Sequence, residues 1–290
     1  MAHSLPPPPS LPLPTHFTRR SLLLLSTTTT TTTLSRPSLA AAPPSPNTTI
    51  TDRVFMDFSL CPNSFVPNPN RTLGDTFSPL CSDSTLLGRV VLGLYGNLVP
   101  LTVSNFKSLC LGLGPISYKN TLVHKIFPGQ YFLAGRQGRP DKGEVRPPHD
   151  LPRNTETVDA KAFVLTHSKP GVVSLSLSEN DDDDDIKLDP GYRNVEFLIT
   201  TGPGPCPQLD YRNIVFGTVL EGLDVITAIA SIPTYQPSER IRQFNNLAKF
   251  FGDERAQNAR NIWNRPLTTV YISDCGELQV TKPSLTPSLP

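Results

Sequence analysis

The sequence predicts a single, mostly β domain, a barrel more than a sandwich, with two helices and an extra helical insertion. Three observations support this class. Many short segments alternate apolar and polar residues in the two-residue period of a strand. Two other segments have the spacing of helices that pack on a sheet, and a polar segment at 238–263 permits a helix. We find no run of about 18 apolar residues, so we expect no membrane span in the mature chain.

Composition separates both ends from the folded part. Ten of the 32 prolines precede residue 47 and three lie in the last eight residues, so both ends are expected to be extended. We expect a leader at 1–42, a linker at 43–50, one folded domain over 51–278 and a disordered tail at 279–290. The domain is expected to carry insertions at about 61–85, 136–165, 178–193 and 233–265.

Residues 1–42 have the features of a targeting sequence. They are rich in hydroxyl side chains and contain no acid, which is typical of an organellar transit peptide. Arg19-Arg20, the short apolar run after them and the small residues up to Ala42 are typical of a translocation signal. We therefore expect the bipartite targeting sequence of a chloroplast thylakoid-lumen protein, with cleavage near Ala42. A disordered low-complexity tail is the alternative interpretation.

Charge and cysteine spacing exclude several classes of function. Without the leader, 23 basic residues stand against 25 acidic ones, which gives no reason to expect nucleic acid or an acidic membrane as partner. The five cysteines lack metal-ligand spacing, so no metal or redox cofactor is expected. Cys61 and Cys81 bracket one insertion and form the only pair for which we expect a disulfide.

The expected strands are 51–60, 88–95, 123–127, 130–133, 172–177, 195–200, 214–219 and 270–275. A first helix is expected at 103–110, with Thr102 as its N-cap and Gly112 as its stop. Val103, Phe106 and Cys110 share one face of this helix and are expected in the core. A second helix is expected at 223–232, ended by Pro233.

Two polar segments need separate interpretation. Asp181–Asp185 is expected to be a solvated loop extended by its own repulsion, rather than a calcium site. In 238–263, the apolar residues Ile241, Phe244, Ala248 and Phe251 have nearly helical spacing, and the polar residues are biased toward arginine and lysine. This segment is either a helix packed on the barrel with a solvated polar face or a docking surface for an acidic partner.

The stretch from Tyr118 to Gly135 carries the strongest functional signal. It predicts a strand, a Pro128-Gly129 turn and a second, aromatic strand. His124 places an imidazole beside the cation of Lys125. Taken alone, the stretch is compatible with a binding groove or with an ordinary hairpin that has two solvated polar residues.

Four segments in this order resemble the cyclophilin family of peptidyl-prolyl cis-trans isomerases. The segments are 88–106, 118–135, 214–225 and 272–276. The resemblance spans roughly 51–278 and implies an eight-stranded antiparallel barrel closed by two helices. It also assigns structural positions to Cys110 and Cys275.

The resemblance implies binding of a peptidyl-proline in an apolar pocket, where members of the family use an arginine to donate a hydrogen bond around the prolyl amide. Such donation weakens amide resonance and lowers a rotation barrier of about 18–20 kcal/mol. This chemistry needs no covalent step, acid–base step or cofactor.

The implied catalytic residues are His124, which matches the family histidine, and Lys125, which stands in place of the arginine. The implied substrate-binding residues are Tyr131, Leu133, Glu196, Leu198, Gln208, Leu209 and Asn213. Of all these positions only His124 and Leu209 keep the family residue. Gln208 replaces the family tryptophan, so we expect poor cyclosporin binding.

Two functions remain open. The first is a peptidyl-prolyl isomerase, of low or narrow activity, that assists protein folding in the chloroplast and acts on proline-containing segments. The second is a cyclophilin-like module that binds one specific protein client, with isomerase activity lost from the altered groove. The sequence does not indicate an oligomeric state.

Overall fold

The computed structural model describes residues 46–62, 81, 83–113, 116–177 and 191–279. The leader at 1–42, the aspartate run, most of the first expected insertion and residues 280–290 lie outside these ranges. The described strands are β1 (Asp52–Cys61), β2 (Thr85–Leu94), β3 (Val123–Phe127), β4 (Tyr131–Ala134), β5 (Val172–Leu175), β6 (Phe197–Thr200), β7 (Ile214–Glu221) and β8 (Thr269–Leu278). The described α-helices are α1 (Pro100–Leu111), α3 (Leu223–Ala230), α4 (Glu239–Phe250) and α5 (Glu254–Arg260). Short 3-10 helices are η2 (Pro140–Lys142), η3 (Thr155–Val158), η4 (Ala160–Phe163) and η5 (Pro207–Leu209).

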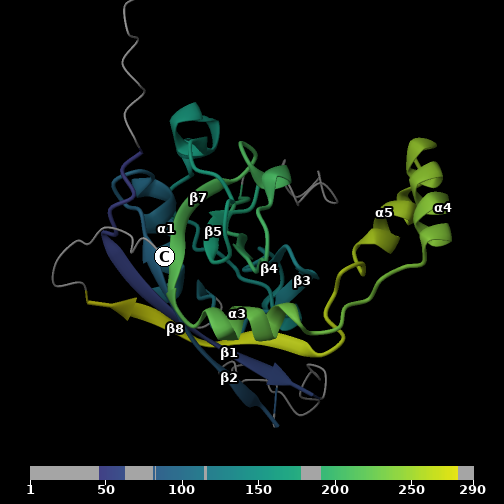
Figure 1. The fold of residues 1–290 in the computed structure, drawn as a ribbon, viewed down its shortest axis with the longest axis horizontal. Coiled ribbons are helices and arrows are strands. Elements are labelled where there is room, and N and C mark those ends of the chain that lie inside the picture. Colours follow the sequence, from purple (N-terminus) through teal and green to yellow (C-terminus); the bar gives the residue numbers. More distant parts are fainter. Residues whose placement is uncertain (1–45, 63–80, 82, 114–115, 178–190, 280–290) are drawn as a thin grey trace, which may run out of the picture. The chain divides into compact units, whose positions relative to one another are not determined.

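The eight strands form one antiparallel sheet in the order β3-β4-β6-β5-β7-β2-β1-β8. Its two edges approach each other, because Leu122, just before β3, bridges to Tyr271 of β8. The backbone N–H of Ile272 also donates to the carbonyl of Thr121 at 2.9 Å. The sheet therefore curls into a nearly closed barrel, which confirms the predicted fold class (Figure 1).

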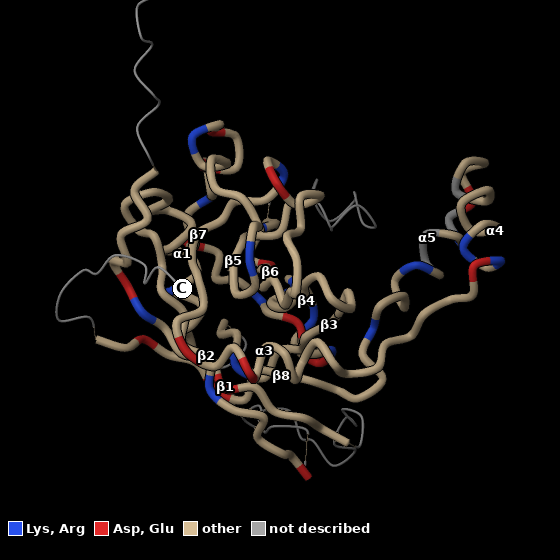
Figure 2. The backbone as a smooth tube through the Cα atoms, viewed as in Figure 1, with Lys and Arg blue, Asp and Glu red and all other residues tan. Residues whose placement is uncertain are grey.

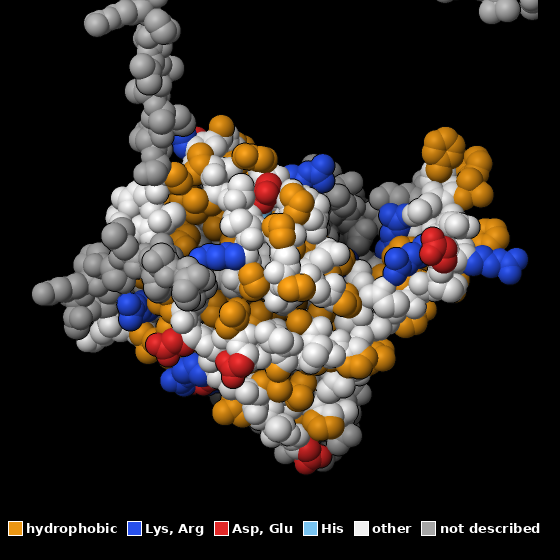
Figure 3. Space-filling view, in the orientation of Figure 1, with side chains coloured by type: hydrophobic (Ala, Val, Ile, Leu, Met, Phe, Trp, Pro, Cys, Tyr) orange, Lys and Arg blue, Asp and Glu red, His pale blue; other side chains and the backbone are white. Residues whose placement is uncertain are grey.

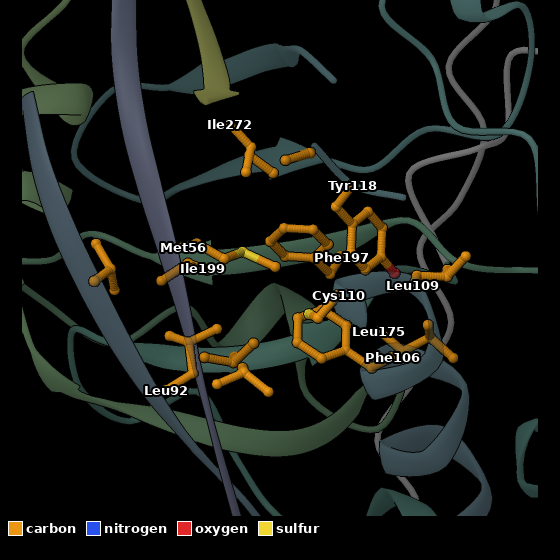
Figure 4. Packing of buried hydrophobic residues seen from close by; sticks show 14 of the residues in the cluster. Met56, Leu92, Phe106, Leu109, Cys110, Tyr118, Leu175, Phe197, Ile199 and Ile272 are labelled. Atoms are coloured by element: carbon orange, nitrogen blue, oxygen red, sulfur yellow. The ribbon is translucent and has the colours of Figure 1, made fainter. Parts of the chain in front are cut away.

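Apolar side chains from the strands and from α1 and α3 fill the barrel. Phe106 of α1 lies 5.2 Å from Tyr118, 5.2 Å from Phe197 and 4.8 Å from Phe216, measured between ring centroids (Figure 4). Val103, Phe106 and Cys110 are all buried, as the helical spacing predicted. The helix α3 buries its apolar face in the same core.

The start of α1 corrects one expectation. Thr102 is not the N-cap; the helix begins at Pro100, after Val99. Proline suits this first turn because its missing N–H would have no intrahelical partner there. The carboxylate of Glu156 in η3 instead accepts hydrogen bonds from the backbone N–H groups of Leu101 and Thr102, both at 2.8 Å. The capping side chain thus lies 54–55 residues away in the sequence, so the residues around the start of the helix do not indicate it.

Two expected boundary regions contribute to the folded core. Ile50, at the end of the expected linker, is fully buried. Val145, Leu151 and Ala162, from the expected insertion at 136–165, belong to the main core cluster. This segment is therefore part of the folded body and not only a surface loop.

Cys61 and Cys81 form a disulfide with a Cα–Cα distance of 5.8 Å. This confirms the one pair that the sequence favoured. The other three cysteines are free thiols. Among the described helices, none combines the length and the apolar character that a bilayer crossing requires.

Candidate active groove

The β3–β4 hairpin positions the predicted catalytic cation. Its turn contains Gly129 with a φ of 71°, a left-handed conformation that glycine adopts without strain. Ile126 and Phe132 point into the barrel core, so the alternate side chains lie on the outer face. The register places Lys125 directly opposite Leu133 on this hairpin.

A second apolar cluster lies apart from the barrel core. We call it the groove cluster: Tyr131, Leu133, Leu198, Cys206 and Leu209. It is built across three elements, because Leu133 of β4 pairs with Leu198 of β6 and Leu209 comes from η5. The ring of Phe127 stacks on Tyr131 at 4.5 Å. Four of the predicted substrate-binding residues are therefore brought together beside Lys125.

The groove cluster is closed in this structure. Each of its five side chains exposes 3% or less of its surface. A proline ring could reach these apolar surfaces only if some of the side chains moved. Opening the groove cluster to a ligand would therefore expose apolar surface, at a cost in free energy.

A pocket of about 640 Å³ lies along β3 on the side of Lys125. Its lining includes His124 and Lys125 but no member of the groove cluster. The cationic lining residues are Lys125, Arg136, Lys142 and Arg265, and the acidic ones are Asp141 and Glu144. The pocket is thus polar and cation-rich, with the predicted catalytic pair in one wall.

His124 pairs with Glu196. The distance between His124 Nε2 and Glu196 Oε1 is 2.6 Å, and the Glu196 side chain is only 2% exposed. Burial raises the pKa of the Glu196 carboxyl, but the charges of His124, Arg136 and Lys125 outweigh this effect and hold the pKa below its ordinary value. Glu196 is therefore the buried partner of His124, and His124 itself lines the pocket beside Lys125.

Gln208 and Asn213 have different surroundings. Gln208 is exposed at the margin of the groove cluster, and its Nε2 donates to Gln130 Oε1 at 2.9 Å. Asn213 is fully buried: its Oδ1 accepts from the N–H of Leu177 and its Nδ2 donates to the carbonyl of Leu209. Asn213 thus fixes the loop that carries Leu209.

Sequence reasoning missed a buried polar chain beneath the groove cluster. Asp210 Oδ1 lies 2.9 Å from His167 Nδ1, and His167 Nε2 lies 2.7 Å from Ser174 Oγ. Burial lowers the pKa of His167, against the opposing effect of Asp210. Ser174 pairs directly with Leu198, so the chain supports the floor of the groove. Since Asp210 is 43 residues from His167, no local pattern reveals the pair.

This arrangement suits hydrogen-bond donation to an amide held against apolar side chains. Lys125 supplies a charged donor on the strand next to the groove cluster. Ser174 and His167 are in contact, as a nucleophile and its general base would be. Both are buried and cannot reach a bound peptide, so we assign them no catalytic role. Within the described ranges, no three His, Cys, Asp or Glu side chains gather as a metal site.

Comparison with known proteins identifies the family. The family model described as cyclophilin type peptidyl-prolyl cis-trans isomerase/CLD matches residues 81–247. The chain is 71% identical over 253 residues to the Arabidopsis thaliana protein named peptidyl-prolyl cis-trans isomerase CYP28, chloroplastic, covering 86% of this chain and 89% of that protein. It is 27% identical over 267 residues to the A. thaliana protein named peptidyl-prolyl cis-trans isomerase CYP26-2, chloroplastic, covering 80% of each chain.

A third relative, matched over a shorter length, is the Saccharomyces cerevisiae protein named peptidyl-prolyl cis-trans isomerase D, 31% identical over 153 residues. That alignment covers 51% of this chain and 59% of the yeast protein. The chain therefore belongs to the family of cyclophilin-type peptidyl-prolyl cis-trans isomerases.

Proposed function

We propose that this protein catalyses cis–trans isomerisation of peptidyl-prolyl bonds, with Lys125 as the catalytic cation. The observation that carries the proposal is the register that sets Lys125 opposite Leu133, at the edge of the groove cluster. Tyr131, Leu133, Leu198 and Leu209 would receive the proline ring once the cluster opens.

Lys125 would lower the rotation barrier by donating a hydrogen bond around the prolyl amide. Resonance in the planar amide opposes rotation, and a donor that favours the twisted state reduces this resonance. Lysine retains the positive charge of an arginine but loses the planar guanidinium, which holds several donors in a fixed geometry. His124, held by Glu196, would position the strand beside the substrate.

The proposed activity is low or confined to few substrates. A closed groove cluster must open before proline enters, and a flexible ammonium is less preorganised than a guanidinium. Glu196 and Asn213, both expected at the substrate, have protein partners in the groove wall. Together these features favour a narrow range of proline-containing segments.

We place this activity in the chloroplast and, more finely, in the thylakoid lumen. Two relatives carry the word chloroplastic in their names. The leader has the composition of a bipartite plastid address. The Cys61–Cys81 disulfide supports a compartment that permits disulfides. The proposed isomerase activity would assist protein folding in the chloroplast.

A binding module is the second candidate. The pocket beside Lys125 favours it, because residues after α5, such as Ile262 and Arg265, form one wall of this pocket. This wall narrows the entrance to the pocket. A narrow entrance suits one specific client protein better than a wide range of substrates.

The test is exchange NMR on a panel of short X-Pro peptides. We expect the wild-type protein to accelerate exchange and Lys125→Ala to lose about 10²-fold of this rate, the usual cost of one preorganised donor. Lys161→Ala, which removes an exposed cation elsewhere, is the matched control and should retain the rate. Absence of catalysis on every peptide, with the barrel folded, would favour the binding module.

A further inference from the structure

The segment between α3 and β8 forms a helical arm. In Figure 1, α4 and α5 lie away from the barrel and are joined to it by two extended segments. We call these segments the limbs; one precedes α4 and the other follows α5. The limbs pair with each other: the N–H of Tyr235 donates to the carbonyl of Arg265, and that of Asn264 donates to the carbonyl of Tyr235, both at 2.9 Å. One limb also binds β3, because the N–H of Ile126 donates to the carbonyl of Asn264 at 2.8 Å. The arm thus has a fixed base.

The two helices of the arm meet through polar side chains. Asn245 of α4 is 8% exposed, and its Nδ2 donates to the carbonyl of Ala256 in α5 at 2.7 Å. Arg260 Nε donates to Asn245 Oδ1, and Arg260 Nη2 donates to Asn246 Oδ1 at 2.6 Å. The side of α4 that is buried within the protein is therefore polar.

The apolar side of α4 faces outward. The apolar side chains of α4 and of the residue that follows it recur at nearly helical spacing and are all exposed: Ile241, Phe244, Leu247, Phe250 and Phe251. We call this set the apolar stripe. At the tip, Phe250 is 84% and Phe251 is 75% exposed. Figure 3 shows apolar side chains gathered on the outer surface of the arm. This is the reverse of a helix packed on the barrel with a solvated polar face.

Charge distinguishes the arm from the rest of the folded chain. Residues 238–265 contain six basic and three acidic residues. Outside the arm and the leader there are 17 basic and 22 acidic residues. The arm therefore has a net positive charge and the remainder a net negative charge, although their sum is close to zero. Arg240, Arg242 and Arg255 are exposed close to the apolar stripe in sequence, and Figure 2 shows basic positions along the arm.

We propose that the arm binds the surface of an anionic lipid bilayer, with the apolar stripe inserted among the acyl chains and its arginines at the headgroups. A polar helix with one aromatic, apolar face and arginines beside it has the composition of an interfacial membrane helix. The twelve residues of α4 span about 18 Å, too short to cross a bilayer but suitable for lying in its surface. The adjacent phenylalanines at the tip supply the apolar wedge.

Sedimentation of the full chain with lipid vesicles tests this proposal. We expect partition onto vesicles that contain phosphatidylglycerol, weaker partition onto phosphatidylcholine alone, and a decrease as salt screens the arginines. Phe250→Ser/Phe251→Ser should weaken partition by about tenfold or more, since two exposed rings lose their apolar burial. Arg240→Gln/Arg242→Gln should weaken binding to the anionic vesicles by about fivefold per arginine and leave phosphatidylcholine binding unchanged.

The matched control is Leu113→Ser/Val158→Ser, which removes two apolar side chains of 86% and 88% exposure outside the arm. It should bind as the wild type does. All variants keep the leader, so a difference between them comes from the arm. Equal partition of the wild type and the phenylalanine variant would overturn the proposal. So would a lipid-independent dimer that the phenylalanine variant alone loses, because a second copy would then cover the apolar stripe.

Discussion

Glu196 and His124 form a hydrogen-bonded pair beside the predicted catalytic cation, Lys125. The Glu196 side chain is only 2% exposed, and the pKa of its carboxyl lies below the ordinary value, so it places a negative charge in the interior. The 2.6 Å contact and the low exposure of Glu196 make the carboxylate a partner of His124 rather than of a substrate. The Glu196 carboxylate thus interacts electrostatically with Lys125 as well as with His124.

We predict that Glu196 contributes to acid sensitivity. The native pKa of its carboxyl lies below the ordinary value of 4.5, so the unfolded chain takes up the proton first as the pH falls. Its contribution is complete above 4.5 and is lost as the pH falls through the native pKa. Urea unfolding across this range should show a shallower pH dependence for Glu196→Gln than for the wild type.

At constant neutral pH, Glu196→Ala should cost about 1–3 kcal/mol, because it leaves the half-buried His124 ring without its hydrogen-bond partner, whereas Glu196→Gln should cost less. Identical pH profiles for the wild type and Glu196→Gln would contradict this account of the pair.

At the residue scale, the sequence placed four of the predicted substrate-binding side chains together but did not predict their exposure; their role at a substrate stays a prediction. Tyr131, Leu133, Leu198 and Leu209 meet as expected, since strand alternation fixes which face each one shares. Their mutual burial and the contact of Glu196 with His124 depend on side-chain packing between distant strands. The His167–Asp210 contact was not predicted for the same reason, because it joins residues that are distant in the sequence.

At the scale of elements, the sequence predicted the eight described strands, because two-residue alternation and runs of β-branched and aromatic residues are both local signals. It placed the start of α1 wrongly, since the cap is the Glu156 carboxylate from η3. It also recognised the helical spacing in α4, but not which face would be buried. That choice depends on Asn245 and Arg260, whose contacts join two helices.

The disulfide ties the end of β1 to the segment before β2. Since 20 residues separate Cys61 from Cys81, breaking the bond frees a loop of moderate length in the unfolded chain. We predict that Cys61→Ser/Cys81→Ser lowers the free energy of unfolding by about 3 kcal/mol in the chain-entropy model. Thermal or denaturant unfolding measures this loss.

A thiol reductant provides the control. It should destabilise the wild type toward the value of the double variant and leave the variant unchanged, because Cys110, Cys206 and Cys275 are already free. A wild type that is indifferent to the reductant and equal in stability to the variant would contradict the prediction.

At the scale of the whole molecule, the family match establishes the fold, whereas the assignment of the site remains our proposal. The barrel, its two covering helices and its core follow the family pattern, as the match over residues 81–247 also shows. The site retains a cation and an apolar cluster, yet the cation is a lysine and the cluster is closed. A fold can persist while its active groove changes, so the activity needs its own test.

The most direct test compares Lys125→Arg with the wild type in the X-Pro exchange measurement. If Lys125 is the catalytic cation and its flexibility limits the rate, a planar guanidinium at this position should accelerate exchange by about tenfold or more. A folded Lys125→Arg protein that is no faster than the wild type would contradict the account, because the cation would then not limit catalysis.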